Sequence, residues 1–231
     1  TACRACLPRR SRLRPLPWEY LHDGESFLVL DRRFSIVRQL RFPITERRRP
    51  PSWPLQVLLA AACPSAQPPL DTASELDALN EAWASRDDVA SHVLDAASPD
   101  SLISSLAGVH LLHFVGHGDF HPLSGEGQLI LHDGHGGETR LSGDRLANEL
   151  YEQRDLYGVV LNACWTARSK GENPYGGVAT ALLQAGIPAV LAMQFAICDR
   201  EAILFSTRLH EGIAAGKPPL APAAELPTDE A

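Results

Sequence analysis

A histidine and a cysteine, two residue types that together support nucleophilic chemistry, each follow a strongly apolar stretch of this sequence. His117 lies in a Gly-His-Gly triplet after residues 109–115, and Cys164 directly follows residues 157–163. A thiol with a pKa of about 8.5 needs a neighbouring imidazole to lower that pKa or to accept its proton. If both stretches are parallel strands, their carboxyl ends share the edge of the sheet where ligands bind. The pattern predicts Cys164 as a nucleophile and His117 as its general base.

The residues next to this pair suit the same chemistry. Gly118 has no Cβ, so its backbone N–H can approach a substrate closely, and with the N–H of Cys164 it can form an oxyanion hole. From spacing alone, plainer interpretations stay open. His117 is equally well explained as an exposed histidine in a Gly-rich turn, and Cys164 as a small apolar residue at a strand end.

Other kinds of site are less well supported by the sequence. Histidines gather between residues 110 and 135, but His110 and His113 face opposite sides of a strand, and no carboxylate or thiol stands at a convincing ligand spacing. We therefore predict no metal and no cofactor. The clustered histidines are interpreted as core or rim residues whose hydrogen bonds are satisfied by the backbone. They are His110, His113, His117, His121, His132 and His135.

Three further motifs lack residues that the corresponding functional sites require. Cys3 and Cys6 form half of a zinc or redox pair without a second half. Gly134–Gly137 lacks the Lys-Ser/Thr ending of a phosphate-binding loop, and no Gly-x-Ser-x-Gly elbow of a serine hydrolase is present. Asp119 is too close to His117 in sequence to orient its ring, and we interpret it as a solvated aspartate.

Strands and helices alternate along most of the chain, and this pattern indicates a mostly parallel sheet covered by helices on both faces. Continuous apolar runs of the kind found in fully buried strands mark the central strands. The expected strands are 55–62, 89–94, 109–115, 128–131, 157–163 and 189–195. The expected helices are 71–83, 99–106 (with Ser98 as N-cap), 142–151, 176–184 and 199–214.

The two ends of the chain have a different character. Residues 1–12 are predicted to be an irregular lead-in, and residues 219–231 a disordered Pro/Ala/Glu tail. Two short strands, 25–30 and 34–40, are predicted to form an N-terminal β-hairpin annex around the turn Asp31–Arg33. The segment between the ends, 13–218, is taken as one domain.

Composition narrows the class of protein. The chain has 231 residues, a formal net charge of −7 and five cysteines. Its apolar runs are far shorter than the roughly 20 residues of a membrane span. An odd cysteine count in a chain of this length favours a reducing, cytoplasmic location. Cys63 and Cys198 are interpreted as packing residues. Because the chain begins at Thr1 and its one methionine is Met193, we interpret it as part of a larger protein.

Charge is unevenly distributed. Residues 1–49 contain 12 arginines and 5 acidic residues, a net of +7, whereas residues 50–231 carry a net of −14. These arginines alternate with apolar residues and aromatic stacking positions among them are sparse, so we do not expect nucleic-acid binding. An arginine-rich solvated face that meets an acidic neighbour explains the segment better.

The ordered set of motifs resembles a CHAT domain. These are caspase-like cysteine peptidases related to separase, found largely in bacteria and often joined to tetratricopeptide repeats. The resemblance covers about residues 13–218, and no single motif decides it. It is carried by Pro17–Leu21, Leu112–Gly118, Leu129–Gly134, Val159–Cys164, Gly176–Ala179 and Gly186–Gln194.

The resemblance implies a caspase–hemoglobinase α/β fold and a cysteine endopeptidase with His117 as base and Cys164 as nucleophile. It also implies substrate-binding roles for Asn162, Trp165 and Gln194. Many relatives that cleave after basic residues carry an acid two residues before the cysteine. Because that position is Asn162 here, a neutral P1 residue is at least as well supported. Trp165 departs from the usual small residue and is expected to line or cover the cleft.

The partners that follow are a protein or peptide substrate, repeat regions of the same full-length protein, or a regulatory protein, with no nucleic acid and no membrane. Residues 168–175 are polar and are expected to move on activation. A non-catalytic caspase-like interaction module is the alternative function, and a latent peptidase that other regions release is a third possibility.

Overall fold

The computed structural model describes residues 16, 18–31, 51–163, 177–193 and 198–214. They fall into two compact units, the first containing residues 16–31 and the second residues 51–214.

The first unit differs from the predicted hairpin. It contains two 3-10 helices, η1 (Trp18–Tyr20) and η2 (Leu28–Leu30), joined by a turn, with one isolated antiparallel bridge between His22 and Phe27. The expected strand over residues 25–30 was therefore wrong. Asp23 Oδ1 accepts hydrogen bonds from the N–H groups of Glu25 and Ser26, and this side-chain capture closes a turn instead. The second expected strand, 34–40, lies outside the described residues.

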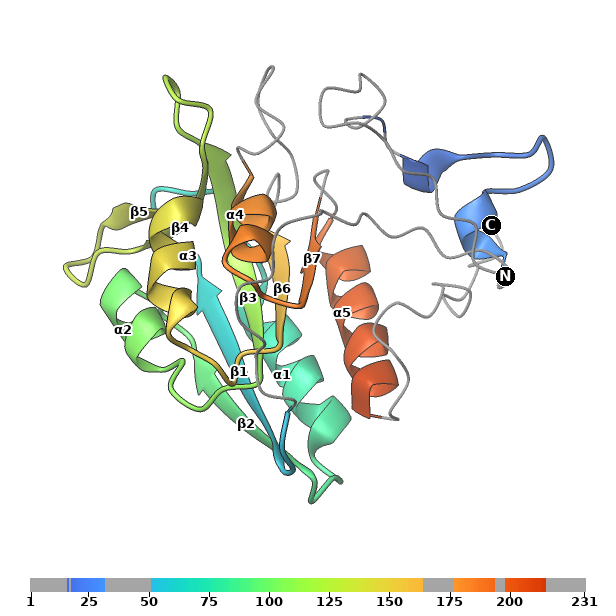
Figure 1. Cartoon of the computed structure of the whole chain (residues 1–231), viewed down its shortest axis with the longest axis horizontal. Coiled ribbons are helices and arrows are strands. Elements are labelled where there is room, and N and C mark those ends of the chain that lie inside the picture. The colour runs from blue at the N-terminus through green and yellow to red at the C-terminus, as the bar shows by residue number, and fades with distance from the viewer. Residues whose placement is uncertain (1–15, 17, 32–50, 164–176, 194–197, 215–231) are drawn as a thin grey trace. The chain divides into compact units, whose positions relative to one another are not determined.

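The described residues of the second unit form a seven-stranded sheet (Figure 1). The sheet is mostly parallel and has helices on both faces, which confirms the predicted layers. The strands β2, β1, β3, β6 and β7 are parallel and lie in that spatial order, and β4 and β5 add an antiparallel extension to β3. The strands are β1 (Leu55–Ala62), β2 (Val89–Leu94), β3 (Leu111–Phe120), β4 (Gly127–His132), β5 (Glu138–Ser142), β6 (Gly158–Ala163) and β7 (Ala189–Ala192).

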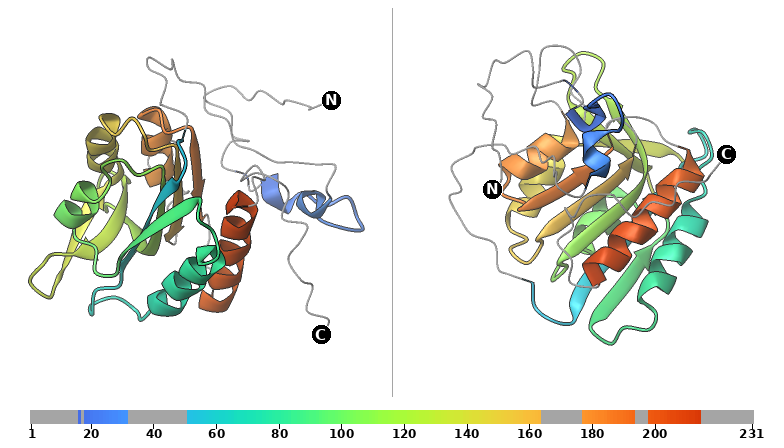
Figure 2. Two further views of the ribbon diagram at one scale, coloured as in Figure 1. Left: turned by 90° about the horizontal axis from the view of Figure 1, so that it is seen from below. Right: turned by 90° about the vertical axis from the view of Figure 1, so that its right-hand side faces the viewer.

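In the described part of the second unit, five α-helices cover the sheet. α1 (Thr72–Trp83) and α5 (Asp199–Ala214) pack side by side on one face (Figure 2). The other face carries α2 (Pro99–Ser104), α3 (Gly143–Tyr151) and α4 (Val178–Gln184). Alternation along the strands divides the core accordingly. Val57, Leu59 and Ala61 pack toward α1 and α5, whereas Leu58, Ala60 and Ala62 pack toward the other helices.

Strand β3 runs five residues further than the sequence indicated. Gly116 and Gly118 suggested the end of a strand, but residues 117–120 pair with β4 in antiparallel register. Gly116 is required by close approach, because a Cβ there would lie 2.6 Å from the carbonyl oxygen of Ala62. The expected loop at His117 was therefore wrong.

The turn between β4 and β5 explains the glycine-rich segment that follows Asp133. Gly134 and Gly136 adopt positive φ angles, and Asp133 Oδ1 accepts hydrogen bonds from the N–H groups of His135 and Gly137. The N–H groups of His135 and Gly137 therefore bind the Asp133 carboxylate rather than pointing outward as they would in a phosphate-binding loop. The segment is thus a hairpin turn leading into β5, a strand that the sequence analysis missed.

Candidate active site

His117 stands where β3 changes partners. Gly116, directly before it, pairs with Ala62 at the end of β1 and with Ala163 at the end of β6, whereas His117 itself pairs with Ile130 of β4. The two neighbouring parallel strands therefore end at the level where His117 begins. Such a point, beyond the carboxyl ends of parallel strands, is the usual place for a ligand in a sheet of this type.

The ring of His117 is held by the loop between β1 and α1. Its Nε2 lies 2.9 Å from the carbonyl oxygen of Pro68. A carbonyl can only accept, so Nε2 must carry the proton in this hydrogen bond. In the neutral imidazole, Nδ1 is then unprotonated and able to accept a proton.

The loop that supplies this carbonyl is anchored at several points. Gln67 Nε2 donates to Glu138 Oε2 of β5 at 2.6 Å, and the Cys63 thiol lies 3.6 Å from the Pro68 carbonyl oxygen. At its far end, the N–H of Asp71 donates to Asp199 Oδ2 of α5 at 3.1 Å. These contacts tie the loop that carries the carbonyl opposite His117 to β5 and α5, and the Cys63 contact joins two parts of the loop itself.

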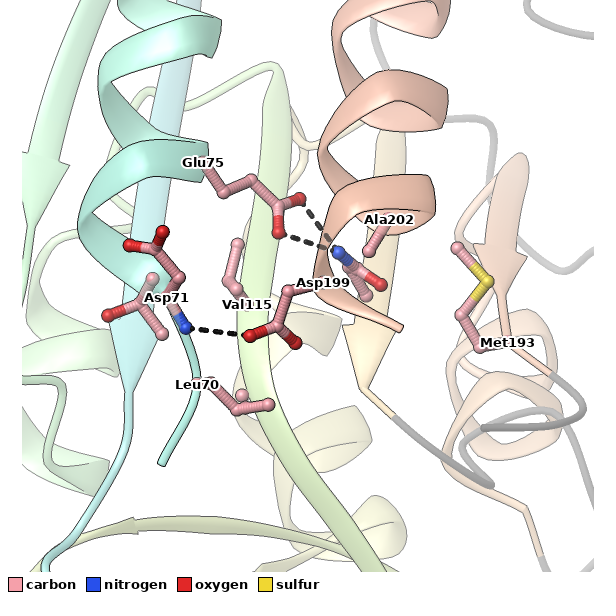
Figure 3. A pocket seen from close by; sticks show the side chains of 10 residues that line it. Leu70, Asp71, Glu75, Val115, Met193, Asp199 and Ala202 are labelled. Atoms are coloured by element: carbon pink, nitrogen blue, oxygen red, sulfur yellow. Dashed lines mark hydrogen bonds between the residues drawn. The ribbon is translucent and has the colours of Figure 1, made fainter. Parts of the chain in front are cut away.

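A buried carboxylate lies below this loop. Glu75 of α1 is 3% exposed, and both of its oxygens accept from the Asn162 side-chain amide, at 2.7 and 2.8 Å (Figure 3). Burial alone would raise the pKa of Glu75, but the hydrogen bond and charge of His113, with further hydrogen bonds from Asn162, outweigh it and lower that pKa. The carboxylate is therefore ionised within the protein.

Two buried histidines extend the network. His113 Nε2 lies 3.2 Å from Glu75 Oε1, and His113 Nδ1 lies 2.9 Å from His210 Nε2 of α5. If His113 donates to the carboxylate, its Nδ1 accepts the proton of His210 Nε2, so every bond in the chain has one donor and one acceptor. Burial holds the pKa of His210 well below its ordinary value, and the repulsion that a protonated His113 would exert acts in the same direction. This series of hydrogen bonds connects β6, α1, β3 and α5.

A pocket opens beside this network (Figure 3). It lies where the parallel pairing of β3 ends at Gly116 and at the carboxyl end of β6, and it reaches the first turns of α1 and α5. Its lining residues are Leu70, Asp71, Thr72, Glu75, Val115, Gly116, Asn162, Met193, Asp199 and Ala202.

The structure describes three of the predicted site residues. His117 is half-buried, Gly118 lies in β3 opposite Leu129, and Asn162 is 8% exposed in β6. Cys164, Trp165 and Gln194 lie outside the described residues, as does the segment 168–175. The roles of these residues remain predictions.

Several secondary interpretations can be compared with the described residues. Asp119 is exposed, and its carboxylate accepts from the N–H of Phe120. Cys63 is half-buried, but Cys198 is exposed, so its interpretation as a packing residue was wrong. The histidines of the cluster were expected to form hydrogen bonds with the backbone. His110 does, because its Nδ1 accepts from the N–H of Gln56, whereas His113 bonds to the Glu75 side chain instead. The described part of the chain contains no group of three His, Cys, Asp or Glu residues able to hold a metal ion.

The family model for the CHAT domain matches residues 7–224. The chain belongs to the CHAT domain family. This caspase-like, peptidase-related family accounts for the sheet and for the motifs at its strand ends. No curated protein gives a significant match to the chain. Within the described residues, every helix of this CHAT domain is too short or too polar to traverse a lipid bilayer.

Sequence reasoning missed two parts of the CHAT site. The Pro68 carbonyl is a backbone group in an irregular loop, and no sequence signal identifies it. Glu75 did have a signal, because it shares the apolar stripe of α1 with Leu79 and Trp83 at intervals of four residues. A carboxylate on the buried stripe of an amphipathic helix indicates a buried polar partner.

Proposed function

We propose that this CHAT domain is a cysteine endopeptidase that uses Cys164 as nucleophile and His117 as general base. The observation that carries the proposal is the hydrogen bond from His117 Nε2 to the Pro68 carbonyl. It leaves Nδ1 as the acceptor that a thiol proton requires and fixes the tautomer before substrate binds.

The register of the sheet supports pairing His117 with Cys164. Ala163, the residue before Cys164, pairs with Gly116, the residue before His117. Side chains alternate along a strand, and Asn162 faces α1 through its bonds to Glu75. Asn162, two residues before Cys164 in the sequence, therefore lies on the side of the sheet on which Pro68 holds His117.

The proposed reaction proceeds in two steps. The Cys164 thiol gives its proton to His117 Nδ1, and its sulfur attacks the scissile carbonyl carbon. His117 then returns the proton to the leaving amine as the C–N bond breaks, leaving a thioester. Water, deprotonated by His117, hydrolyses the thioester and regenerates the thiol. The N–H groups of Gly118 and Cys164 are proposed to stabilise the oxyanion.

The test compares two cysteine variants. Cleavage sites in a proteome are mapped after incubation with the wild type, with Cys164→Ala and with Cys198→Ala. Cys198 is the control because it is an exposed free cysteine and, among the described residues, forms no hydrogen bond with the loop that holds His117, unlike Cys63. We expect Cys164→Ala to abolish cleavage and Cys198→Ala to retain it. Retained cleavage in Cys164→Ala would refute the proposal.

A further inference from the structure

The carbonyl that holds His117 belongs to a stiff segment of the loop between β1 and α1. Proline rings fix φ at Pro68 and Pro69, and the ring of Pro69 also restricts ψ of the residue before it. The Pro68 carbonyl therefore cannot turn independently of its own segment. Its direction is set by how the Pro-Pro segment is held, and the residue that leads into this segment is Gln67.

Gln67 is fixed through both its backbone and its side chain. Its N–H donates to the Pro64 carbonyl oxygen at 2.9 Å and closes a turn. Its Nε2 donates to Glu138 Oε2 at 2.6 Å, a short hydrogen bond to a carboxylate. The other oxygen, Glu138 Oε1, lies 3.1 Å from Arg140 Nη2. The Glu138 carboxylate thus uses one oxygen for the loop and the other for its own strand, β5.

Glu138 and His117 lie on the same face of the same sheet. His117 of β3 pairs with Ile130 of β4, and Ile130 in turn pairs with Arg140 of β5. Directly paired residues share a face, and so do residues two apart on one strand, which places Glu138 on the face of His117. The histidine and the carboxylate therefore belong to one hydrogen-bonded sheet, and the loop is attached to both.

We propose that Glu138 and Gln67 are positioning residues, which hold the Pro68 carbonyl where it selects the Nε2–H tautomer of His117. This inference rests on the proposed function, because it assigns the control of the general base. Neither Glu138 nor Gln67 lines the pocket beside His117. Without their hydrogen bond the loop can shift and the ring can adopt the other tautomer, in which Nδ1 carries a proton and cannot accept one from a thiol.

The first measurement is the tautomer of the His117 ring, read from its side-chain nitrogen NMR shifts at alkaline pH, with His117→Asn to assign the signals. The wild type should be predominantly Nε2–H. Glu138→Ala should shift the ratio of the two forms by about fivefold or more toward Nδ1–H, because the loop loses a hydrogen bond. Glu138→Gln keeps an oxygen that accepts from Gln67, so it should retain the wild-type ratio. Thr139→Ala, whose side chain lies on the opposite face of β5, should also leave the ratio unchanged.

A second variant removes the same hydrogen bond from the side of the loop. Gln67→Ala leaves β5 intact and should shift the tautomer ratio as Glu138→Ala does. Because the two residues act through one bond, the double variant Gln67→Ala/Glu138→Ala should be no worse than either single variant. With a peptide that the wild type cleaves, kcat should fall by about tenfold or more in all three variants, since a misplaced base slows proton transfer. KM should stay within about threefold of the wild-type value, because neither residue lines the pocket.

Failure of this inference differs from failure of the proposed function. An unchanged tautomer ratio in Glu138→Ala and Gln67→Ala would overturn the inference and leave the peptidase intact. Equal shifts in Glu138→Gln and Glu138→Ala, a similar shift in Thr139→Ala, or additive effects in the double variant would also overturn it, because each points to general damage rather than to one hydrogen bond. A wild type that cleaves no peptide would count against the proposed function, and the tautomer ratios, which are read without substrate, would still decide the inference.

Discussion

Replacing His210 should remove a defined part of the acid sensitivity of this domain. His210 is fully buried, and its Nδ1 has no hydrogen-bond partner among the described residues. Burial holds its pKa well below the ordinary value. The folded protein therefore keeps the ring neutral at pH values where the unfolded chain protonates it, and stability falls as the pH drops below the pKa in the unfolded chain, about 6.5.

The magnitude follows from proton linkage. Between pH 7.5 and pH 5.5 the unfolded imidazole changes from mostly neutral to mostly protonated, while the folded ring stays neutral, so the wild type should lose roughly 1 kcal/mol through His210. Glu75 does not contribute to the change in the free energy of unfolding between pH 7.5 and pH 5.5. Its pKa in the folded state is lowered, so its contribution is complete above its ordinary pKa and is lost only as the pH falls further.

The assay is urea unfolding at pH 7.5, 6.5 and 5.5, with the free energy of unfolding compared between variants. His210→Gln keeps a donor for His113 Nδ1 but has no titrating group, so its stability should fall by about 1 kcal/mol less than that of the wild type over this interval. His92→Gln, at an exposed position of β2, should behave like the wild type. Equal losses in His210→Gln and the wild type would refute the reasoning.

Two further predictions concern stability. Gly116→Ala should cost about 1–3 kcal/mol, because its Cβ would meet the Ala62 carbonyl and the Phe114 ring, whereas Gly212→Ala, with open space in α5, should be neutral or stabilising by up to about 1 kcal/mol. Chemical unfolding of both variants checks this, and equal effects would contradict it. Ser98→Ala removes the capping box of α2 and should cost about 1 kcal/mol, against less than about half of that for exposed Ser104→Ala in a thermal melt.

The central layers of the fold could be predicted because their signals are local. Residues 55–62 are apolar apart from Gln56 and form β1 with the predicted bounds, and α5 begins and ends as its amphipathic pattern indicated. The extension of β3 and the strand β5 depend instead on pairing between segments. Glycines that look like breaks in a sequence are compatible with a strand when a neighbouring backbone approaches closely, and single-sequence reasoning does not detect that approach.

The sequence predicted the residue of the candidate site that follows a strand core, but not the groups that hold it in place. His117 was identified because it follows an apolar run and is flanked by glycines. Its partner, the Pro68 carbonyl, is a backbone group that every residue possesses, so its role arises from the path of the loop. Glu75 was placed in a helix without recognition that it faces β6, because a helical pattern fixes which residues share a face but not what that face meets.

The polar groups of the site belong to one face of the sheet, and this explains why α1 and α5 matter to it. His113, Val115 and His117 alternate with residues that pack against the opposite helices, and Asn162 joins them from β6. A parallel sheet supplies backbone partners within its plane and no partners for side chains that leave that plane. Those side chains must be satisfied by the covering layer, here Glu75 of α1, His210 of α5 and the loop that carries Pro68. The same helices therefore stabilise the core and determine the charge of the pocket beside His117.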